Sequence, residues 1–458
     1  MPEQVRSKRN VSRRKFLKAS ALASGAFIVP RHFLAGADGT PPSEQFRVAG
    51  IGAGGNMCRN DLRRVIEEGN GTVVALADPW ELDQWQGRAK KWREQYYPDA
   101  KIYRDYRKLM DNEKLDGLVV ATNDNWHANV SMDGMRRGLN VYTEKPLTLT
   151  VHEARELAKA AKKYKVATQM GNNGHHGEWI RVICEHIWGG TIGKIREVHA
   201  WSDRAGTHWT QGIGRPKDTP PVPKELDWNL WLGPAQERPY HPWYTRLIWR
   251  GWCDFGTGAL GDMGCHILDS VYWGLKLGAP TTVEASTTLH PAEARKETFP
   301  VAAHITYQFP ARGDMSPLTL KWFDGGIQPP APHGLPKGEK LPPNGAIYYG
   351  DKGVMYHQVF QMPKFLGDLA GAPNAKATIE RCPSHYREWV EEGKGSGKPC
   401  GSNFQYAAGL TEMVLLGTIA ARIGGAERLE WDEENMRFTN SEEATGMLSR
   451  EYRKGFEL

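Results

Sequence analysis

Residues 46–55 read FRVAGIGAGG, a short apolar run that ends in a cluster of glycines. The run predicts a buried strand, and the spacing Gly50-x-Gly52-x-x-Gly55 predicts the tight turn that leads from it into a helix over residues 61–68. The free N–H groups at the start of such a helix attract phosphate. A dinucleotide-binding turn is therefore expected, although a chain with 50 glycines also produces this spacing by chance.

A carboxylate follows the next expected strand at the distance typical of a ribose ligand. The strand over residues 72–77 leads into Asp78, 23 residues after Gly55. A carboxylate in this position accepts hydrogen bonds from the ribose hydroxyls of NAD and repels the 2′-phosphate of NADP. The alternative role for Asp78 is a cap on the following helix. We expect NAD as the cofactor.

Strand and helix patterns alternate as far as residue 170. Helices are expected at residues 105–112, 126–137 and 151–164, and strands at residues 115–121, 139–142 and 166–170. This order predicts an α/β domain over residues 46–170 with a doubly wound parallel (Rossmann) sheet, whose ligands lie at the carboxyl ends of the strands. Two of those ends carry polar groups, TNDNWH at residues 122–127 and TEKP at residues 143–146.

The composition changes from residue 171, where a second domain is expected to run to residue 458. Ten of the 17 tryptophans fall between Trp179 and Trp273. Alternating apolar segments at residues 195–201, 282–288, 302–309 and 317–322 predict an α+β domain with a large, open, mainly antiparallel sheet. A helix over residues 407–423 is expected to pack back on it. Indole rings stack on sugars, but most of these are expected to fill the core.

The segment richest in chemical groups covers residues 252–269, WCDFGTGALGDMGCHILD. A helix from Leu260 onward would place Asp262, His266 and Asp269 on one face. The same spacing would suit a metal, but zinc needs a third nitrogen or sulfur ligand at a recognisable offset, and Cys265 points elsewhere. No metal is expected.

These motifs together resemble the Gfo/Idh/MocA family of sugar and inositol oxidoreductases. The glycine loop, the segment from Thr122 to His127 and above all Glu144-Lys145-Pro146 carry the resemblance, which extends over residues 46–458. It implies NAD-dependent oxidation of a secondary alcohol in a sugar, polyol or glycoside, and a cis bond before Pro146. It also implies three catalytic residues: Lys145 beside the nicotinamide, His266 as the acid/base and Asp262 to orient the sugar. A surface ion pair is the alternative for Lys145.

The expected contacts of the two ligands follow from these positions. The cofactor is expected to contact Gly50, Gly52, Gly54, Gly55, Asn56, Met57, Asp78, Thr122, Asn123, His127, Glu144, Lys145 and Pro146. The substrate is expected to contact His175, His176, Trp252 and Asp269. Either histidine could instead cap the helix that starts near Glu178. The sequence leaves the roles of His385, Tyr386 and Asn403 open.

The first 37 residues resemble a twin-arginine export signal. Arg13-Arg14 precede a mildly apolar stretch of about eleven residues, and Ala35-Gly36-Ala37 offers a site for a signal peptidase. The stretch is shorter than the roughly twenty residues that span a bilayer, and no downstream segment is expected to reach that length. We expect a linker over residues 38–45, the twin-arginine machinery as a partner, a periplasmic or otherwise exported mature chain and no stable membrane insertion. The alternative is the basic N-terminus of a cytosolic protein.

Charge and cysteine content exclude other classes. The 458 residues carry a formal charge of +6, of which residues 1–37 contribute +7, so the remainder is close to neutral at −1. No field that would gather nucleic acid is present. Six scattered cysteines without a CxxC pair make no disulfide framework. A homo-oligomer is expected.

Export raises a difficulty for the chemistry, because free NAD is not expected outside the cytoplasm. The cofactor is therefore expected to be tightly bound and regenerated in place. One route is a paired oxidation and reduction of two sugars, as in the family's glucose–fructose oxidoreductases. Another is a redox-neutral cycle of oxidation, elimination, hydration and re-reduction, as in its NAD-dependent glycosidases. A third interpretation is a nucleotide-binding sensor without turnover.

Overall fold

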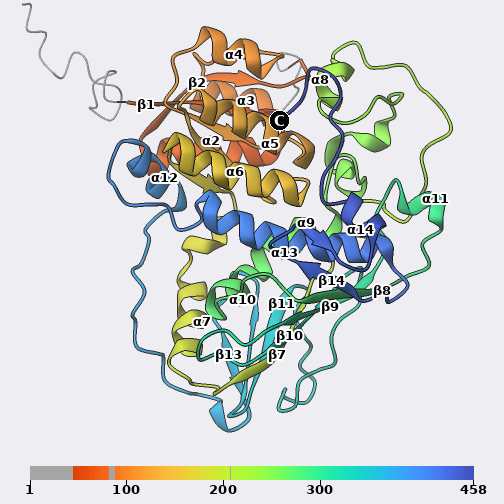
Figure 1. Ribbon diagram of the computed structural model, residues 1–458. Coiled ribbons are helices and arrows are strands. Elements are labelled where there is room, and N and C mark those ends of the chain that lie inside the picture. Colours follow the sequence, from red (N-terminus) through yellow and green to blue (C-terminus); the bar gives the residue numbers. More distant parts are fainter. Residues whose placement is uncertain (1–44, 82–87, 207) are drawn as a thin grey trace, which may run out of the picture. The chain divides into compact units, whose positions relative to one another are not determined.

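A computed structural model describes residues 45–81, 88–206 and 208–458 (Figure 1). The expected leader over residues 1–37 and nearly all of the linker over residues 38–45 lie outside the described residues. Residues 46–458 hold two sheets, which share one layer of helices and pack as a single unit.

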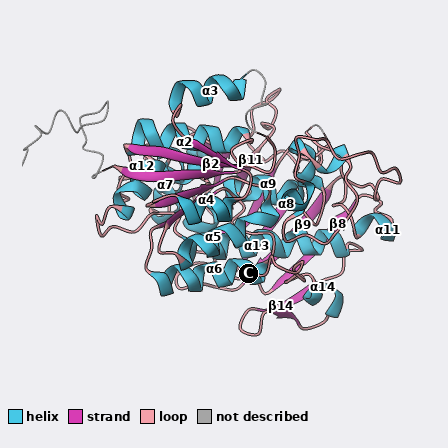
Figure 2. Ribbon diagram, turned by 90° about the horizontal axis from the view of Figure 1, so that it is seen from above, coloured by secondary structure: helices cyan, strands magenta, loops and turns pink. Residues whose placement is uncertain are grey.

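The first sheet has six parallel strands in the order β3-β2-β1-β4-β5-β6. The strands are β1 (Phe46–Ile51), β2 (Gly71–Ala77), β3 (Lys101–Tyr103), β4 (Gly117–Val120), β5 (Asn140–Thr143) and β6 (Thr168–Met170). The helices that connect them are α2 (Asn56–Gly69), α3 (Arg88–Tyr96), α4 (Tyr106–Asn112), α5 (Asp124–Arg136) and α6 (Val151–Tyr164). Figure 2 shows α2 and α3 on one face and α4, α5 and α6 on the other. The doubly wound sheet is confirmed.

Helix α6 illustrates how local sequence sets these elements. Thr150 accepts a hydrogen bond from the backbone of Glu153, whose carboxylate accepts one from the backbone of Thr150. This capping box starts the helix. The helix then buries a stripe at three- and four-residue spacing, which holds it against the sheet and its neighbours.

The second sheet has nine strands in the order β13-β12-β11-β7-β10-β9-β8-β14-β15. They are β7 (Ile195–Trp201), β8 (Thr282–Thr287), β9 (Ala303–Phe309), β10 (Leu318–Phe323), β11 (Gly345–Gly350), β12 (Val354–Gln358), β13 (Lys364–Leu366), β14 (Leu429–Asp432) and β15 (Arg437–Phe438). Neighbours pair antiparallel except β7 with β10, which is parallel. The mainly antiparallel sheet is confirmed.

A layer of helices joins the two sheets. It contains α7 (Glu178–Trp188), α9 (Gly258–Ile267), α10 (Asp269–Gly274), α12 (His385–Gly393) and α13 (Phe404–Ile423), and shorter helices α8 (Trp228–Leu232), α11 (Ala292–Arg295) and α14 (Glu442–Gly446) lie in the loops. Helix α13 crosses the centre of Figure 1 and packs against α6, α9 and β8. Helix α12 packs against α2. The C-terminal part of the chain therefore contributes to both halves.

Helix α13 is, by length and composition, also apolar enough to cross a membrane, so the expectation that no downstream segment reaches that length is wrong. In the structure, 83% of its most apolar 18-residue stretch is buried. This is how the core helix of a globular fold behaves.

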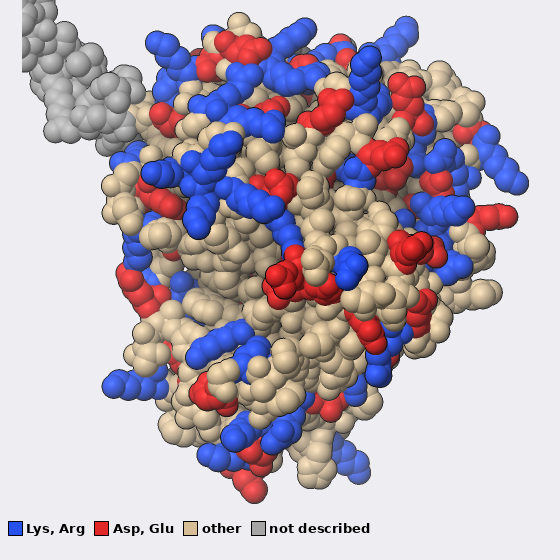
Figure 3. All heavy atoms as spheres, viewed as in Figure 1, with Lys and Arg blue, Asp and Glu red and all other residues tan. Residues whose placement is uncertain are grey.

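On the surface, acidic and basic side chains alternate over the face that Figure 3 shows, in keeping with the near-neutral charge of residues 38–458.

Candidate active site

The turn between β1 and α2 has the form expected of a phosphate site. Gly52 has φ +81°, and a Cβ there would lie 2.5 Å from the carbonyl oxygen of Ala121, so only glycine fits. Gly55 is the N-cap of α2 and has no side chain to cap the helix. The first N–H groups of α2 are thus available to a phosphate.

Gly50 lies before this turn, within β1, whereas the sequence pattern predicts it to be part of the turn. A Cβ on Gly50 would lie 2.6 Å from Cδ1 of Leu62 and 3.1 Å from Sγ of Cys58. Gly50 therefore allows α2 to pack closely on β1, and the turn itself runs over residues 52–55. Asn56 and Met57 begin α2, and both are accessible there.

Asp78 lies directly after β2 and contacts the glycine turn. Its Oδ2 accepts a hydrogen bond of 2.7 Å from the backbone of Gly54, and its Oδ1 accepts one of 2.9 Å from Trp80. Burial raises the pKa of Asp78 to about 6. Each carboxylate oxygen retains a lone pair, so the group can still accept from a ribose hydroxyl.

His127 joins the polar loops that follow β4 and β5. Its Nδ1 lies 2.8 Å from the carbonyl oxygen of Pro146, and its Nε2 lies 3.3 Å from that of Thr122. The ring is 1% exposed, and burial lowers its pKa to about 4. His127 therefore positions the two loops, and its expected contact with the cofactor stays a prediction. Asn123 is the N-cap of α5 at the same strand end.

Glu144 belongs to a buried acidic pair that the sequence did not reveal. Its Oε1 is buried and has no hydrogen-bond partner among the described residues. Burial raises the pKa of Glu144 to about 7. Burial and the charge of Glu144 also raise the pKa of Asp61 in α2, which accepts a hydrogen bond of 2.8 Å from Tyr386. The side chains of α2 and α12 thus support the start of the Glu144-Lys145-Pro146 segment, whose Lys145–Pro146 bond is cis.

Lys145 meets Asp262 at the centre of the site. Its Nζ lies 2.9 Å from Oδ1 of Asp262 and 2.6 Å from the carbonyl oxygen of the same residue. Arg250 donates from Nε to the same Oδ1 at 3.0 Å, and Nε of Arg204 lies 3.7 Å from Oδ2. Burial alone would raise the pKa of Asp262, but the charges of Lys145 and Arg250 hold it well below its usual range. The carboxylate is therefore ionised at neutral pH.

His266 lies one helical turn after Asp262 in α9. Its Nδ1 is buried and has no partner among the residues that the structure describes. Burial, then the charge of Lys145, lowers the pKa of His266 to about 3, so the ring is neutral and able to accept a proton. The ring of Phe360 meets it edge-on, with centroids 5.4 Å apart. No group of three or more His, Cys, Asp or Glu in the described ranges is arranged to hold a metal.

Asp269 lies apart from this face, because α9 ends at Ile267 and Asp269 begins α10. Its carboxylate is 1% exposed and binds inward, with Nδ1 of His175 at 3.0 Å, Nδ2 of Asn172 at 3.0 Å and the hydroxyl of Tyr406 at 2.5 Å. His175 is 3% exposed. Nδ1 of His175 and the Asp269 carboxylate thus bind each other at the junction of the two halves, and their expected contact with substrate stays a prediction.

His176 and Trp252 also make internal contacts. Nδ1 of His176 contacts the carbonyl oxygen of Asn173, and the N-cap of α7 is Gly177, so neither histidine caps that helix. Trp252 has no exposed surface, and its indole N–H donates to the carbonyl oxygen of Trp243 at 2.7 Å. It lies in an aromatic cluster with Tyr244, so its position indicates packing.

The three residues without an assigned role prove to connect elements. Nε2 of His385 lies 2.8 Å from the carbonyl oxygen of Met170, at the end of β6. Tyr386 binds Asp61, as described above. Asn403 caps α13 by accepting hydrogen bonds from the backbone of Gln405 and Tyr406.

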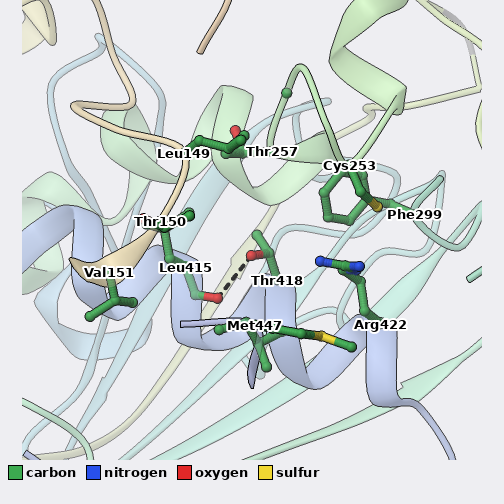
Figure 4. Close-up of a pocket in the computed structure, with 12 residues that line it drawn as sticks. Leu149, Thr150, Val151, Cys253, Thr257, Phe299, Leu415, Thr418, Arg422 and Met447 are labelled. Carbon is green, nitrogen blue, oxygen red and sulfur yellow. Dashed lines mark hydrogen bonds between the residues drawn. The ribbon is translucent and has the colours of Figure 1, made fainter. Parts of the chain in front are cut away.

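Two cavities lie outside this cluster of charged groups. The smaller, of about 30 Å³, is bounded by α13 and holds the hydrogen bond of 2.8 Å from Thr418 to Leu415 (Figure 4). It has room for water and not for a sugar. The larger, of about 620 Å³, is lined by residues between 326 and 343 and by Ser202 and Asp203. Its lining thus includes Asp203, the residue before Arg204, and its volume is that of a small-molecule site.

Two family models match the chain. Residues 46–172 match the model described as an oxidoreductase family with an NAD-binding Rossmann fold, and residues 187–311 match the C-terminal alpha/beta domain of the same family. The chain belongs to the Gfo/Idh/MocA oxidoreductase family. Family membership assigns NAD binding to the six-stranded sheet, where the glycine turn and Asp78 lie.

Relatives in this family have different activities. MocA, the rhizopine catabolism protein of Rhizobium meliloti, is 27% identical over 151 residues, 33% of this chain and 45% of the relative. Inositol 2-dehydrogenase of Salmonella typhimurium is 27% identical over 160 residues, which are 35% of this chain and 46% of that protein. The chain thus spans under half the length of these two. Glycosyl hydrolase family 109 protein 1 of Akkermansia muciniphila is 23% identical over 391 residues, 84% of this chain and 71% of that protein.

Solved structures share the fold over most of the chain. Aldose-aldose oxidoreductase from Caulobacter crescentus, complexed with glycerol, has a TM-score of 0.56 at 17% identity and covers 84% of this chain and 100% of that one. The WlbA dehydrogenase from Bordetella pertussis, in complex with NADH and UDP-GlcNAcA, has a TM-score of 0.57 at 14% identity, over 85% and 99%. At these identities the likeness concerns the fold.

Proposed function

We propose that this protein is an NAD-dependent oxidoreductase that acts on the secondary alcohol of a sugar, polyol or glycoside. The observation that carries the proposal is the contact of Lys145 with Asp262, with His266 one turn further along α9. This arrangement combines a hydrogen-bond donor, a fixed carboxylate and a neutral imidazole at the carboxyl end of β5. A secondary alcohol needs a proton acceptor and an oxygen-stabilising donor in such a position.

The residues present fit the cofactor. The first turn of α2 would bind the pyrophosphate, because its N–H groups are open at Gly55, and Asp78 would accept from the ribose. NAD, when bound, supplies the group that accepts a hydride from the carbinol carbon. Thr122, Glu144 and Pro146 line the strand ends between these points.

The proton chemistry belongs to this chain's own side chains. His266 takes the hydroxyl proton as the carbonyl forms, and returns it when the reaction runs backward. Lys145 has three N–H donors, of which two bind Asp262, so the third remains for the same substrate oxygen. Asp262 holds Lys145 in place and accepts from a neighbouring sugar hydroxyl.

We also propose that the cofactor stays bound through export. The twin-arginine pattern at Arg13-Arg14 favours export of a folded chain, so NAD would be loaded beforehand and dissociate slowly in the periplasm. Slow dissociation is the usual source of tight binding. A homo-oligomer is part of the same proposal, and light scattering of the purified protein tests it.

A second candidate function is redox-neutral cleavage of a glycoside. The glycosyl hydrolase family 109 relative favours it, since that alignment covers 84% of this chain while those with MocA and inositol 2-dehydrogenase cover about a third. In this cycle, oxidation at C3 acidifies the C2 hydrogen, the glycosidic group is eliminated, water adds and the ketone is reduced again. No net electrons are consumed, so a trapped cofactor suffices.

One experiment separates the two. The purified protein is mixed with NAD and with sugars, polyols and nitrophenyl glycosides, and nicotinamide absorbance and sugar products are followed together. Formation of a keto sugar, matched by either one NADH or one reduced second sugar, supports the oxidoreductase. Release of nitrophenol with neither net NADH nor a net sugar oxidation supports the cleavage cycle. Absence of keto sugar and of nitrophenol with every compound and pair of compounds contradicts the proposed function.

A further inference from the structure

Two arginines flank the carboxylate of Asp262, although alcohol oxidation itself requires neither. Nε of Arg250 lies 3.0 Å from Oδ1, and Nε of Arg204 lies 3.7 Å from Oδ2. The side chains of Lys145, Asp262, Arg250 and Arg204 are 8%, 11%, 16% and 21% exposed. The exposed fraction therefore increases from Lys145 to Arg204, so the two arginines lie on the solvent side of the site.

The arginines have donors to spare. A guanidinium carries five N–H groups, and Arg250 uses one of them on Asp262, while no hydrogen bond within the described part of the chain involves its Nη1 or Nη2. Arg204 uses Nη1 on Asp203. The ring of Trp249 lies 4.3 Å from the Arg250 guanidinium and holds its plane in place.

The charges around these groups leave a cationic outer site. Lys145, Arg204 and Arg250 face two carboxylates, those of the largely buried Asp262 and of the partly exposed Asp203. The other nearby carboxyl groups are deeper. Asp124 accepts a hydrogen bond from Thr257, and burial raises its pKa to about 7. Burial likewise raises the pKa of Glu144 to about 7.

We propose that the substrate sugar carries an anionic group, a carboxylate or a sulfate, which binds the free N–H groups of Arg250 and Arg204. This inference rests on the proposed function and names its substrate class. Planar guanidinium groups match the oxygen spacing of both anions, and charge-assisted bonds of this kind are about twice as strong as neutral ones.

An anion in this position would also act on His266. Burial, Lys145, Arg204 and Arg250 all lower the pKa of His266, which makes the imidazole a weak proton acceptor. A negative group against the arginines offsets that field and raises the basicity of His266 when substrate is bound. Neutral sugars lack this effect, so the site discriminates in chemistry as well as in binding.

The test compares matched substrates on the NAD-loaded protein. Each hexose is paired with its hexuronate and its 6-sulfate, and kcat/KM is measured for all three. We expect one anionic series to exceed the hexose by about tenfold or more, the scale of one charge-assisted hydrogen bond, and the preferred series tells carboxylate from sulfate. Arg250→Gln and Arg204→Gln should each reduce this ratio, and Arg250→Lys should restore it in part. Arg215→Gln, at a surface ion pair, should leave the ratio unchanged.

Binding provides a readout that does not require turnover. Calorimetry of the NADH-loaded protein with the same compounds measures affinity in a complex that cannot oxidise the alcohol. Hexoses that react and bind as well as their anionic partners would overturn the inference and leave the proposed function intact. If no compound is oxidised, the proposed function fails, and equal affinity for hexose and anion would then overturn the inference as well.

Discussion

Nζ of Lys145 reaches both the carboxylate and the carbonyl oxygen of Asp262, a residue 117 positions further along the chain. The lysine follows β5 of the first sheet, and the aspartate lies in α9, one of the helices in the layer that joins the two sheets. The two halves of the molecule therefore meet at their reacting groups. A change in Lys145 is expected to affect chemistry before it affects the binding of either ligand.

Lys145→Met should slow hydride transfer while the nucleotide still binds. Methionine keeps the volume of the side chain but removes the donor that stabilises charge on the substrate oxygen. The loss of one such donor corresponds to roughly two to three orders of magnitude in rate. Single-turnover kinetics measures the step, and fluorescence titration with NADH measures binding.

The matched control for this variant is Lys101→Met. Lys101 pairs with Glu113 at the surface of the first sheet and is 66% exposed, so its loss should change neither rate nor affinity. If Lys145→Met lost nucleotide binding along with activity, the lysine would be structural.

His266 should give a pH dependence that responds to Lys145. The proton acceptor must be neutral, so activity is lost as pH falls through its pKa. That pKa is about 3 because of burial and then of Lys145. In Lys145→Met the pKa should rise, and the acidic limb of kcat/KM should move to higher pH. The limb should be absent in His266→Gln.

Stability offers a second measure of the same group. The pKa of His266 in the folded state is below the unfolded value of about 6.5, so unfolding takes up a proton between the two. Its contribution to stability is thus present above pH 6.5 and is lost as pH falls toward 3. Denaturation of His266→Gln should show a weaker fall over this range. An identical fall would contradict the assigned pKa.

Asp78→Ser should reduce the preference for NAD over NADP. The carboxylate repels a 2′-phosphate, an effect expected to exceed about 1 kcal/mol, or several-fold in relative affinity. Asp116→Ser is the control, because Asp116 also accepts a backbone N–H, from Arg47 at 2.7 Å, but lies at the opposite ends of the strands. A ratio within about twofold of wild type for Asp78→Ser would exclude the assigned role.

Gly52→Ala should destabilise the fold more than Gly138→Ala. The two glycines have similar positive φ angles, +81° and +76°, so both variants carry the same backbone strain, about 1–2 kcal/mol. A Cβ on Gly52 meets Ala121 at 2.5 Å, whereas nothing lies within 4 Å of a Cβ on Gly138. Overpacking should add about 1–3 kcal/mol at Gly52. Urea unfolding measures the difference, and equal losses would contradict the close approach.

Replacement of Arg13 and Arg14 by lysine should retain active protein in the cytoplasm. The pair is what the expected export pathway recognises, and it belongs to the expected leader and not to the site residues, so activity per molecule should be unchanged. Periplasmic wild-type protein should retain NAD through dialysis. Recovery of a nucleotide-free protein that needs added NAD in every assay would contradict the bound-cofactor proposal.

Much of the first half follows from local pattern. Apolar runs with glycine or polar ends predict β1, β2, β4, β5 and β6, and the amphipathic pattern of residues 151–164 predicts α6. The short β3 was missed because its three residues, Lys101–Tyr103, are partly exposed and show no alternation. The sequence pattern includes Gly50 in the glycine turn, whereas the structure places Gly50 within β1. A strand that ends in glycine gives no sign of where it stops.

The second half is less visible in sequence because its strands are defined by their partners. β11 to β13 lie among loops rich in proline and glycine, and β13 and β15 have only three and two residues, so propensity is weak there. Buried polar residues raise the same difficulty. Asp269 and His175 come from two separate segments and were each expected to contact substrate, yet the two bind each other at the junction of the halves.

The charged part of the site divides in the same way. Lys145, Asp262 and His266 belong to compact motifs and could be found from the sequence. No pattern marks Arg204 or Arg250, which come from a loop after β7 and from a turn before α9, and meet only through Asp262. Their contribution depends on three distant segments reaching one carboxylate.

The C-terminal segment completes the nucleotide-binding half. Arg450 donates to the carbonyl oxygen of Asn125 in α5, 325 residues earlier, and Asn129 donates to the carbonyl oxygen of Phe456. At ribosomal rates of roughly 5–20 residues per second, synthesis of Arg450 follows that of Asn125 by about 15 to 65 seconds. During that interval the nascent first half presents an uncovered flank to chaperones. These contacts of the C-terminal segment can therefore form only after nearly the whole chain has been translated.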